Sequence, residues 1–166
     1  MSRPVKILLA AAGCVIAVAI CCIAAIGGGV LLFNEAYKTD DRISISVETP
    51  ERITEGDEFE FRMVVTNSGD SDLTITEMDI SESLLEGTDV ISVDPEPVSS
   101  SSFTVIEEYL EYTFDPFTIR PGESRAVTLT LKAEFDGLYR GDITFYNDRL
   151  FNQQEYHTSF RIHPEE

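Results

Sequence analysis

The side chains that could perform chemistry are few in kind, and their spacing does not favour catalysis. The chain has two histidines, three cysteines and thirty acidic residues. His157 and His163 are six residues apart in a segment of alternating apolar residues, so both are predicted to face solvent. A zinc site there would need ligands from elsewhere in the chain. Serines are abundant, but none lies in the Gly-x-Ser-x-Gly sequence of a hydrolase nucleophile.

The carboxylates are too numerous for their spacing to identify an acid–base pair. In so acidic a chain, two carboxylates at any separation carry little information. No glycine-rich phosphate loop precedes a helical pattern. The sequence therefore predicts no catalytic residue, no metal, no cofactor and no small-molecule substrate, and we expect that the chain is not an enzyme.

Calcium is the one ligand that the aspartates leave open. Asp70 and Asp72 lie in a predicted turn, and Asp40 and Asp41 precede the first predicted strand. Carboxylate oxygens are suitable calcium ligands, although this spacing does not match an EF-hand loop. Aspartate also favours turns for local reasons, so these residues need no ion to explain them.

An apolar segment near the start of the chain predicts where the protein is located. Residues 7–33 contain no charged side chain. As a helix, residues 7–26 would be about 30 Å long, which matches the hydrocarbon core of a membrane. Arg3 and Lys6 precede this segment. Because basic residues favour the cytoplasmic side, residues 1–6 are predicted in the cytoplasm and residues 34–166 outside a single membrane-spanning helix.

Three other interpretations of this segment compete with the membrane helix. A cleaved signal peptide usually has an apolar region of about 7–15 residues, which is much shorter. Ala12, Gly13 and Cys14 resemble a lipoprotein leader, but the apolar run continues for 19 residues after Cys14. A pilin-type leader would have a Gly-Phe cleavage site followed by a glutamate near the start of the helix, and this pattern is missing here. All three cysteines lie within this segment, so the remaining chain cannot be a disulfide scaffold.

The region after this segment is strongly acidic. It holds ten basic and thirty acidic residues, a net charge of −20. Such a surface repels nucleic-acid phosphates, so no nucleic-acid partner is expected. It is compatible with cationic partners, divalent ions or high salt.

Alternating apolar residues predict that this region is a β domain. Residues 34–41 read as a short polar stalk, and residues 42–164 as the domain. Alternation predicts strands at residues 43–47, 59–65, 110–114, 127–135, 138–146 and 156–162. Another strand begins at Leu73, and its apolar phase shifts by one residue after Ile75, which predicts a bulge or a bend.

Residues 81–102 have the weakest pattern. A short strand is predicted at residues 88–93. Residues 94–102 are predicted to form a loop, because prolines cannot donate to a strand ladder and the serines provide no core. No segment beyond residue 41 shows a helical period over three turns. This range is therefore expected to be the main irregular surface.

About seven strands separated by turns favour an all-β fold, an antiparallel immunoglobulin-like β-sandwich preceded by one transmembrane helix. Tyr139 stands two residues before Gly141, at the spacing of a tyrosine corner and the following cysteine in immunoglobulin domains. Glycine at that position excludes the inter-sheet disulfide. The other interpretation of Tyr139 is a buried strand aromatic.

The turns resemble those of a known group of domains. Residues 55–59 with residues 64–70 resemble the first strands of prokaryotic cell-surface Ig-like domains, including the CARDB type. The Pro-Gly-Glu turn within residues 117–124 resembles the turn before a late strand in the same group. The resemblance extends over residues 42–164. It implies an Ig-like fold at a cell envelope and a binding or spacer role, with no catalytic residues.

These observations together predict a single-pass membrane protein with an extracytoplasmic Ig-like module. We expect this module to bind another envelope protein or to act as an accessory subunit, through its sheet edges and residues 81–102. The alternative is a structural component of an envelope or pilus-like assembly.

Overall fold

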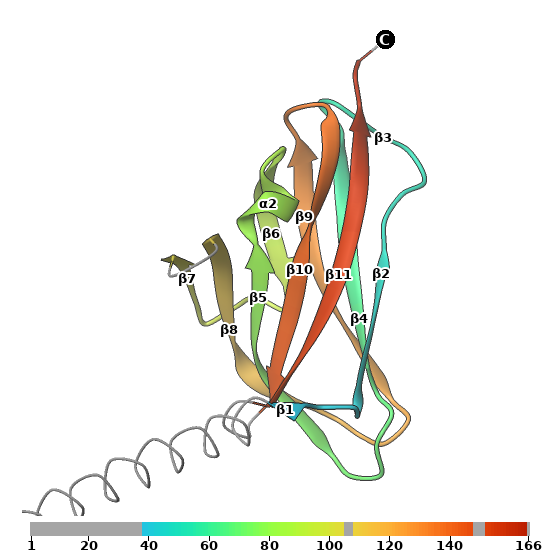
Figure 1. Cartoon of the computed structure of the whole chain (residues 1–166), viewed down its shortest axis with the longest axis vertical. Coiled ribbons are helices and arrows are strands. Elements are labelled where there is room, and N and C mark those ends of the chain that lie inside the picture. Colours follow the sequence, from blue (N-terminus) through green and yellow to red (C-terminus); the bar gives the residue numbers. More distant parts are fainter. Residues whose placement is uncertain (1–37, 105–107, 148–151, 166) are drawn as a thin grey trace, which may run out of the picture. The chain divides into compact units, whose positions relative to one another are not determined.

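Two β-sheets packed face to face form the part of the chain that the structure describes (Figure 1). The computed structural model describes residues 38–104, 108–147 and 152–165. The predicted membrane helix at residues 7–33 lies outside these ranges. Within them, no helix is both long enough and apolar enough to cross a bilayer.

The larger sheet, sheet A, holds seven strands and the smaller, sheet B, holds four. Sheet A has the order β1 (Lys38–Thr39), β11 (Asn152–His163), β10 (Gly137–Asn147), β5 (Leu73–Ser81), β8 (Glu108–Ile119) and β7 (Ser99–Thr104), with β3 (Ile53–Thr54) parallel to β11. Sheet B has the order β2 (Ile43–Glu48), β4 (Glu58–Asn67), β9 (Ser124–Ala133) and β6 (Thr88–Asp94). A one-turn helix, α2 (Glu82–Leu85), connects β5 to β6.

The core lies between the sheets because each strand directs alternate side chains inward. In β4 the buried apolar positions are Phe59, Phe61, Met63 and Val65, as their alternation predicts. Phe160 of sheet A packs against this row, with ring centroids 5.6 Å from Phe59 and 5.7 Å from Phe61. Aromatic contacts across the layers therefore join the two sheets, and no disulfide is needed.

The predicted bulge after Ile75 is confirmed. The pairing of β5 with β8 shifts in register between Ile75 and Glu77. Beyond the shift, Met78 and Ile80 point into the core. Glu77 and Asp79 are therefore placed on the opposite, outer face of sheet A. The bulge thus determines which acidic side chains reach that face.

The prediction of a loop at residues 94–102 is wrong for the second half of this range. Ser99–Thr104 forms β7, an edge strand that pairs antiparallel with β8. An edge strand is held by backbone hydrogen bonds on one side, so it needs no apolar face, and Ser99–102 are exposed. The described residues form eleven strands where about seven were expected, and no strand was predicted at β7 or at the two-residue strands β1 and β3. Phe135, predicted in a strand, lies beyond the end of β9 and is 65% exposed.

The tyrosine corner is confirmed by the hydrogen bonds of Tyr139. Its hydroxyl donates to the backbone carbonyl of Phe135 at 2.9 Å, four residues upstream. Gly87 lies directly against the ring, and a Cβ at that position would come within 1.9 Å of it. Tyr139 thus joins the β9–β10 turn to the segment after α2.

A buried ion pair holds the first described residues on the sandwich. Asp40 is only 7% exposed, and Arg42 donates to it from Nε at 2.8 Å and from Nη2 at 2.5 Å. Asn147 Nδ2 of β10 donates to the same carboxylate at 2.5 Å. The Asp40 amide also donates to the carbonyl of Gln153 in β11. These contacts explain the aspartate without a metal ion.

Candidate functional site

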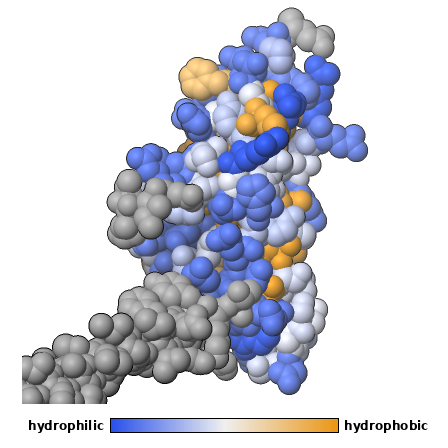
Figure 2. Space-filling model, viewed as in Figure 1, coloured by the Kyte–Doolittle hydropathy of each residue, from blue (hydrophilic) through white to orange (hydrophobic). Residues whose placement is uncertain are grey.

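The outer face of sheet A gathers most of the functional side chains that the structure describes. Backbone pairing places Asp79 of β5 directly opposite Glu111 of β8 and beside Thr144 of β10. Tyr146 of β10 lies opposite Glu77. The space-filling view of this face is mostly hydrophilic, with small hydrophobic areas (Figure 2). It is therefore a polar surface built on a rigid, hydrogen-bonded frame.

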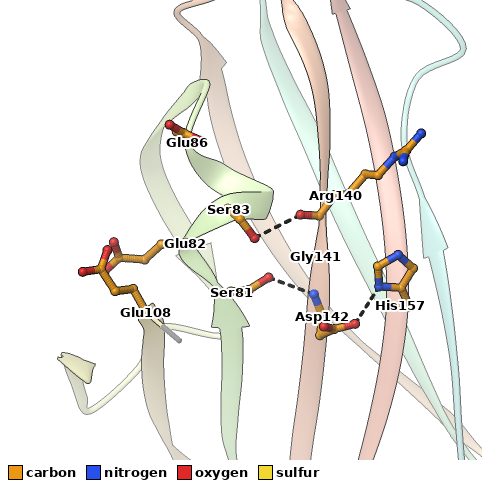
Figure 3. Close-up of a pocket in the computed structure, with 9 residues that line it drawn as sticks. All are labelled: Ser81, Glu82, Ser83, Glu86, Glu108, Arg140, Gly141, Asp142 and His157. Carbon is orange, nitrogen blue, oxygen red and sulfur yellow. Dashed lines mark hydrogen bonds and ion pairs between the residues drawn. The ribbon is translucent and has the colours of Figure 1, made fainter. Parts of the chain in front are cut away.

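A shallow depression of about 700 Å³ lies on this face beside α2. Residues from four neighbouring strands, the helix and its C-terminal end line it: Ser81, Glu82, Ser83, Glu86, Glu108, Arg140, Gly141, Asp142 and His157 (Figure 3). Glu82, Glu86 and Glu108 are among these lining residues. The depression therefore has several carboxylates on its rim and is open to solvent.

His157 and Asp142 form a pair at one side of the depression. They are directly opposite each other in the β10–β11 hairpin, and His157 Nδ1 is 2.7 Å from Asp142 Oδ1. The His157 side chain is 70% exposed, so the prediction that it faces outward is confirmed. Because the aspartate holds one ring nitrogen, the other nitrogen is directed away from Asp142.

The two serines at the depression support the backbone. Ser81 Oγ accepts a hydrogen bond from the Asp142 amide at 2.8 Å, where β5 leaves the sheet for α2. Ser83 Oγ donates to the Arg140 carbonyl at 3.0 Å. Ser81 is only 4% exposed, and its hydroxyl replaces the carbonyl that a continuing strand would have supplied. This geometry fits a structural hydroxyl rather than a nucleophile.

Three carboxylates form a second cluster, near the middle of the same face. One oxygen each of Glu77, Asp79 and Glu111 lies within 4.8 Å of the others. Burial raises the pKa of Glu77 above its usual value, and the charges of Glu111 and Asp79 raise it further. Burial also raises the pKa of Asp79, against the opposing effect of a hydrogen bond from Tyr146. The cluster therefore holds negative charge at an electrostatic cost.

Tyr146 fixes the orientation of Asp79. Its hydroxyl donates to Asp79 Oδ2 at 2.7 Å. Burial and the neighbouring carboxylate raise the pKa of Tyr146 far above its ordinary value. The phenol therefore stays protonated and remains a hydrogen-bond donor throughout the physiological range.

The raised pKa values predict that protonation of this cluster stabilises the fold. Because Glu77 and Asp79 bind protons more readily in the folded state, their contribution to stability should rise as pH falls from 7 through their raised pKa values. In Glu77→Gln this rise should be smaller, and the variant should be more stable than the parent at pH 7 by less than about 1 kcal/mol, since these groups remain partly solvated.

Urea unfolding of both proteins in EDTA, at several pH values from 7 to 4, measures the difference. The same difference at every pH would contradict this account.

Sequence reasoning missed the carboxylate cluster and the His157–Asp142 pair for a similar reason. The alternation of Glu77 and Asp79 shows only that they share a strand face. Their approach to Glu111 depends on the register across a bulge, and the approach of Asp142 to His157 depends on the register of a hairpin. The alternation of residues within one strand does not show how that strand is aligned with its neighbours. Asp70 and Asp72, the other candidate calcium ligands, are exposed near the β4–β5 connection and are not in the cluster.

Comparison with known proteins identifies the fold. No protein-family model matches the sequence, and no match was found among curated proteins. A cohesin module from a family 33 glycoside hydrolase of Clostridium perfringens has a TM-score of 0.52 at 12% identity, covering 74% of this chain and 98% of that module. The described residues form an Ig-like β-sandwich. The predicted Ig-like fold is thereby confirmed for the described residues.

A CARDB domain is a more distant structural neighbour. This domain of the PF1109 protein from Pyrococcus furiosus, solved in complex with di-metal ions, has a TM-score of 0.40 at 13% identity, covering 75% of this chain and 92% of that domain.

Proposed function

We propose that the chain is a non-enzymatic binding module, held at the cell membrane by residues 7–33 with its sandwich outside the cytoplasm. Its partner would be another envelope protein that presents basic side chains. The observation that carries this proposal is the depression beside α2, whose rim bears Glu82, Glu86 and Glu108 on a hydrogen-bonded sheet. A basic segment would complement both its shape and its charge.

Two further features support a binding role. The depression is broad and open, a form that suits contact with another protein surface better than enclosure of a small substrate. The solved neighbour with the same fold is itself one module of a larger enzyme, described as a cohesin module. Both the Ig-like fold and the acidic face are therefore compatible with a module that presents a surface.

Reversing charge at the depression should abolish partner capture. In Glu82→Lys/Glu108→Lys, two lysines would repel a basic partner, and we expect recovery to fall at least tenfold. The measurement is affinity capture with the full-length protein from detergent-solubilised membranes of the source cell, quantified by mass spectrometry.

The matched control is Glu58→Lys/Glu60→Lys, which makes the same charge change on exposed positions of β4 in sheet B. This control should retain the partner. A partner that both variants lose equally, or that both retain, would refute the assignment to the depression.

A further inference from the structure

The carboxylate cluster on the outer face of sheet A has a geometry that suits a metal ion. Asp79 and Glu111 are directly paired across β5 and β8, and Glu77 is two residues along the same strand. One oxygen from each lies within 4.8 Å of the others, so all three can reach a single point between them. The ligands project from paired strands, which hold them more firmly than a loop would.

A separate observation points to a missing ligand. Asp79 Oδ1 exposes less than 1 Å² to solvent and accepts no hydrogen bond. Among the side-chain atoms of residues 38–104, 108–147 and 152–165, it is the single buried nitrogen or oxygen left without a partner. Buried carboxylate oxygens are nearly always paired with a donor or a cation. The Tyr146 hydroxyl already contacts the other oxygen, so it does not satisfy this one.

We propose that Glu77, Asp79 and Glu111 bind one divalent cation, and that calcium is the preferred ion. The three ligands are all carboxylates, and hard cations prefer such oxygens to sulfur or nitrogen. Calcium tolerates irregular geometry and completes its shell with water, which suits a partly solvated sheet face. The cation also offsets the mutual repulsion of the three carboxylates. This site is independent of the proposed partner site at the depression.

The role of Tyr146 in this site is to position a ligand. Its hydroxyl donates to Asp79 Oδ2 at 2.7 Å, so it holds this carboxylate in place. The phenol also lies close enough to transfer excitation to a bound lanthanide. Terbium, which resembles calcium in size and ligand preference, is therefore a direct probe of the site.

The test uses the full-length protein in detergent, stripped of metal with EDTA. Terbium should give tyrosine-sensitised emission that calcium displaces, with a calcium dissociation constant of about 10⁻⁴–10⁻³ M. Calcium at about 10 mM should raise the melting temperature by roughly 3–6 °C, whereas sodium chloride of equal ionic strength should not. Magnesium tested in parallel should displace terbium less effectively.

Two variants make the test specific. Glu111→Gln removes one charged ligand and relieves repulsion, so it should fold, and its calcium affinity should fall about tenfold or more. Glu155→Gln makes the same change on an exposed position of β11 and should bind calcium like the parent. Absence of saturable displacement, or equal calcium affinity in Glu111→Gln, would overturn the proposal. Stabilisation by acid alone, with no calcium effect, would show instead that the cluster holds a shared proton.

Discussion

Replacing Asp40 with asparagine should lower the free energy of unfolding by about 3–4 kcal/mol. The substitution keeps the size of the side chain but removes its charge. Arg42, only 19% exposed at its side chain, would then lose the carboxylate that it contacts through Nε and Nη2. Asn147 would lose a charged acceptor at the same time. Arg42 would keep its charge in a largely buried position with a neutral amide in place of the carboxylate, and this weaker pairing accounts for most of the cost.

Asp41 supplies a matched control for this experiment. It is the next residue, it is exposed, and Asp41→Asn makes the same change of charge. We expect its effect to stay within about 0.5 kcal/mol. Urea unfolding of the two full-length variants, followed by circular dichroism, gives both values. Equal losses would show that net charge near the first strand, rather than the buried pair, determines stability.

The buried pair also shows how local sequence patterns mislead. In the sequence, Asp40 and Asp41 look alike, as parts of a polar stalk or as possible calcium ligands. Only Asp40 is drawn into the sandwich, because β1 pairs with β11 and places it next to Asn147. Those partners are more than a hundred residues away along the chain. No local pattern distinguishes the two aspartates.

The strands themselves were largely predictable, because alternation of apolar residues reports which face of a strand is buried. The pattern in β4 located both the strand and its inward row. Prediction failed at β7, where serines exposed on an edge leave no hydrophobic signal, and at α2, which is too short to show a period. The candidate sites could not be predicted for a different reason. They depend on the register between strands, which alternation does not specify.

Gly141 carries the second large expected effect. It stands two residues after the corner tyrosine, at the position where immunoglobulin domains have a cysteine. A Cβ there would lie 1.9 Å from Ser81 Oγ and 2.9 Å from Leu84 Cβ. Glycine is therefore required because the end of β5 and α2 pack directly on the β10 backbone. The packing of α2 replaces the disulfide as the contact at this position.

Gly141→Ala should therefore destabilise the fold by about 2–4 kcal/mol, through overpacking and loss of the Ser81–Asp142 hydrogen bond. Ser81→Ala alone should cost about 1 kcal/mol, because the Asp142 amide loses its acceptor. In the double variant the clash with Oγ is absent, so the combined loss should be smaller than the sum by at least about 1 kcal/mol. The contact with Leu84 remains, so rescue should be partial.

Urea unfolding of the parent, the two single variants and the double variant completes the thermodynamic cycle. Strictly additive losses would mean that Ser81 and Gly141 do not share the space that the structure assigns to them. The depression is a second readout, because Ser81, Gly141 and Asp142 all line it. If Gly141→Ala displaces α2, partner capture should weaken even under conditions where the variant stays folded, and Ser81→Ala should restore part of it in the double variant.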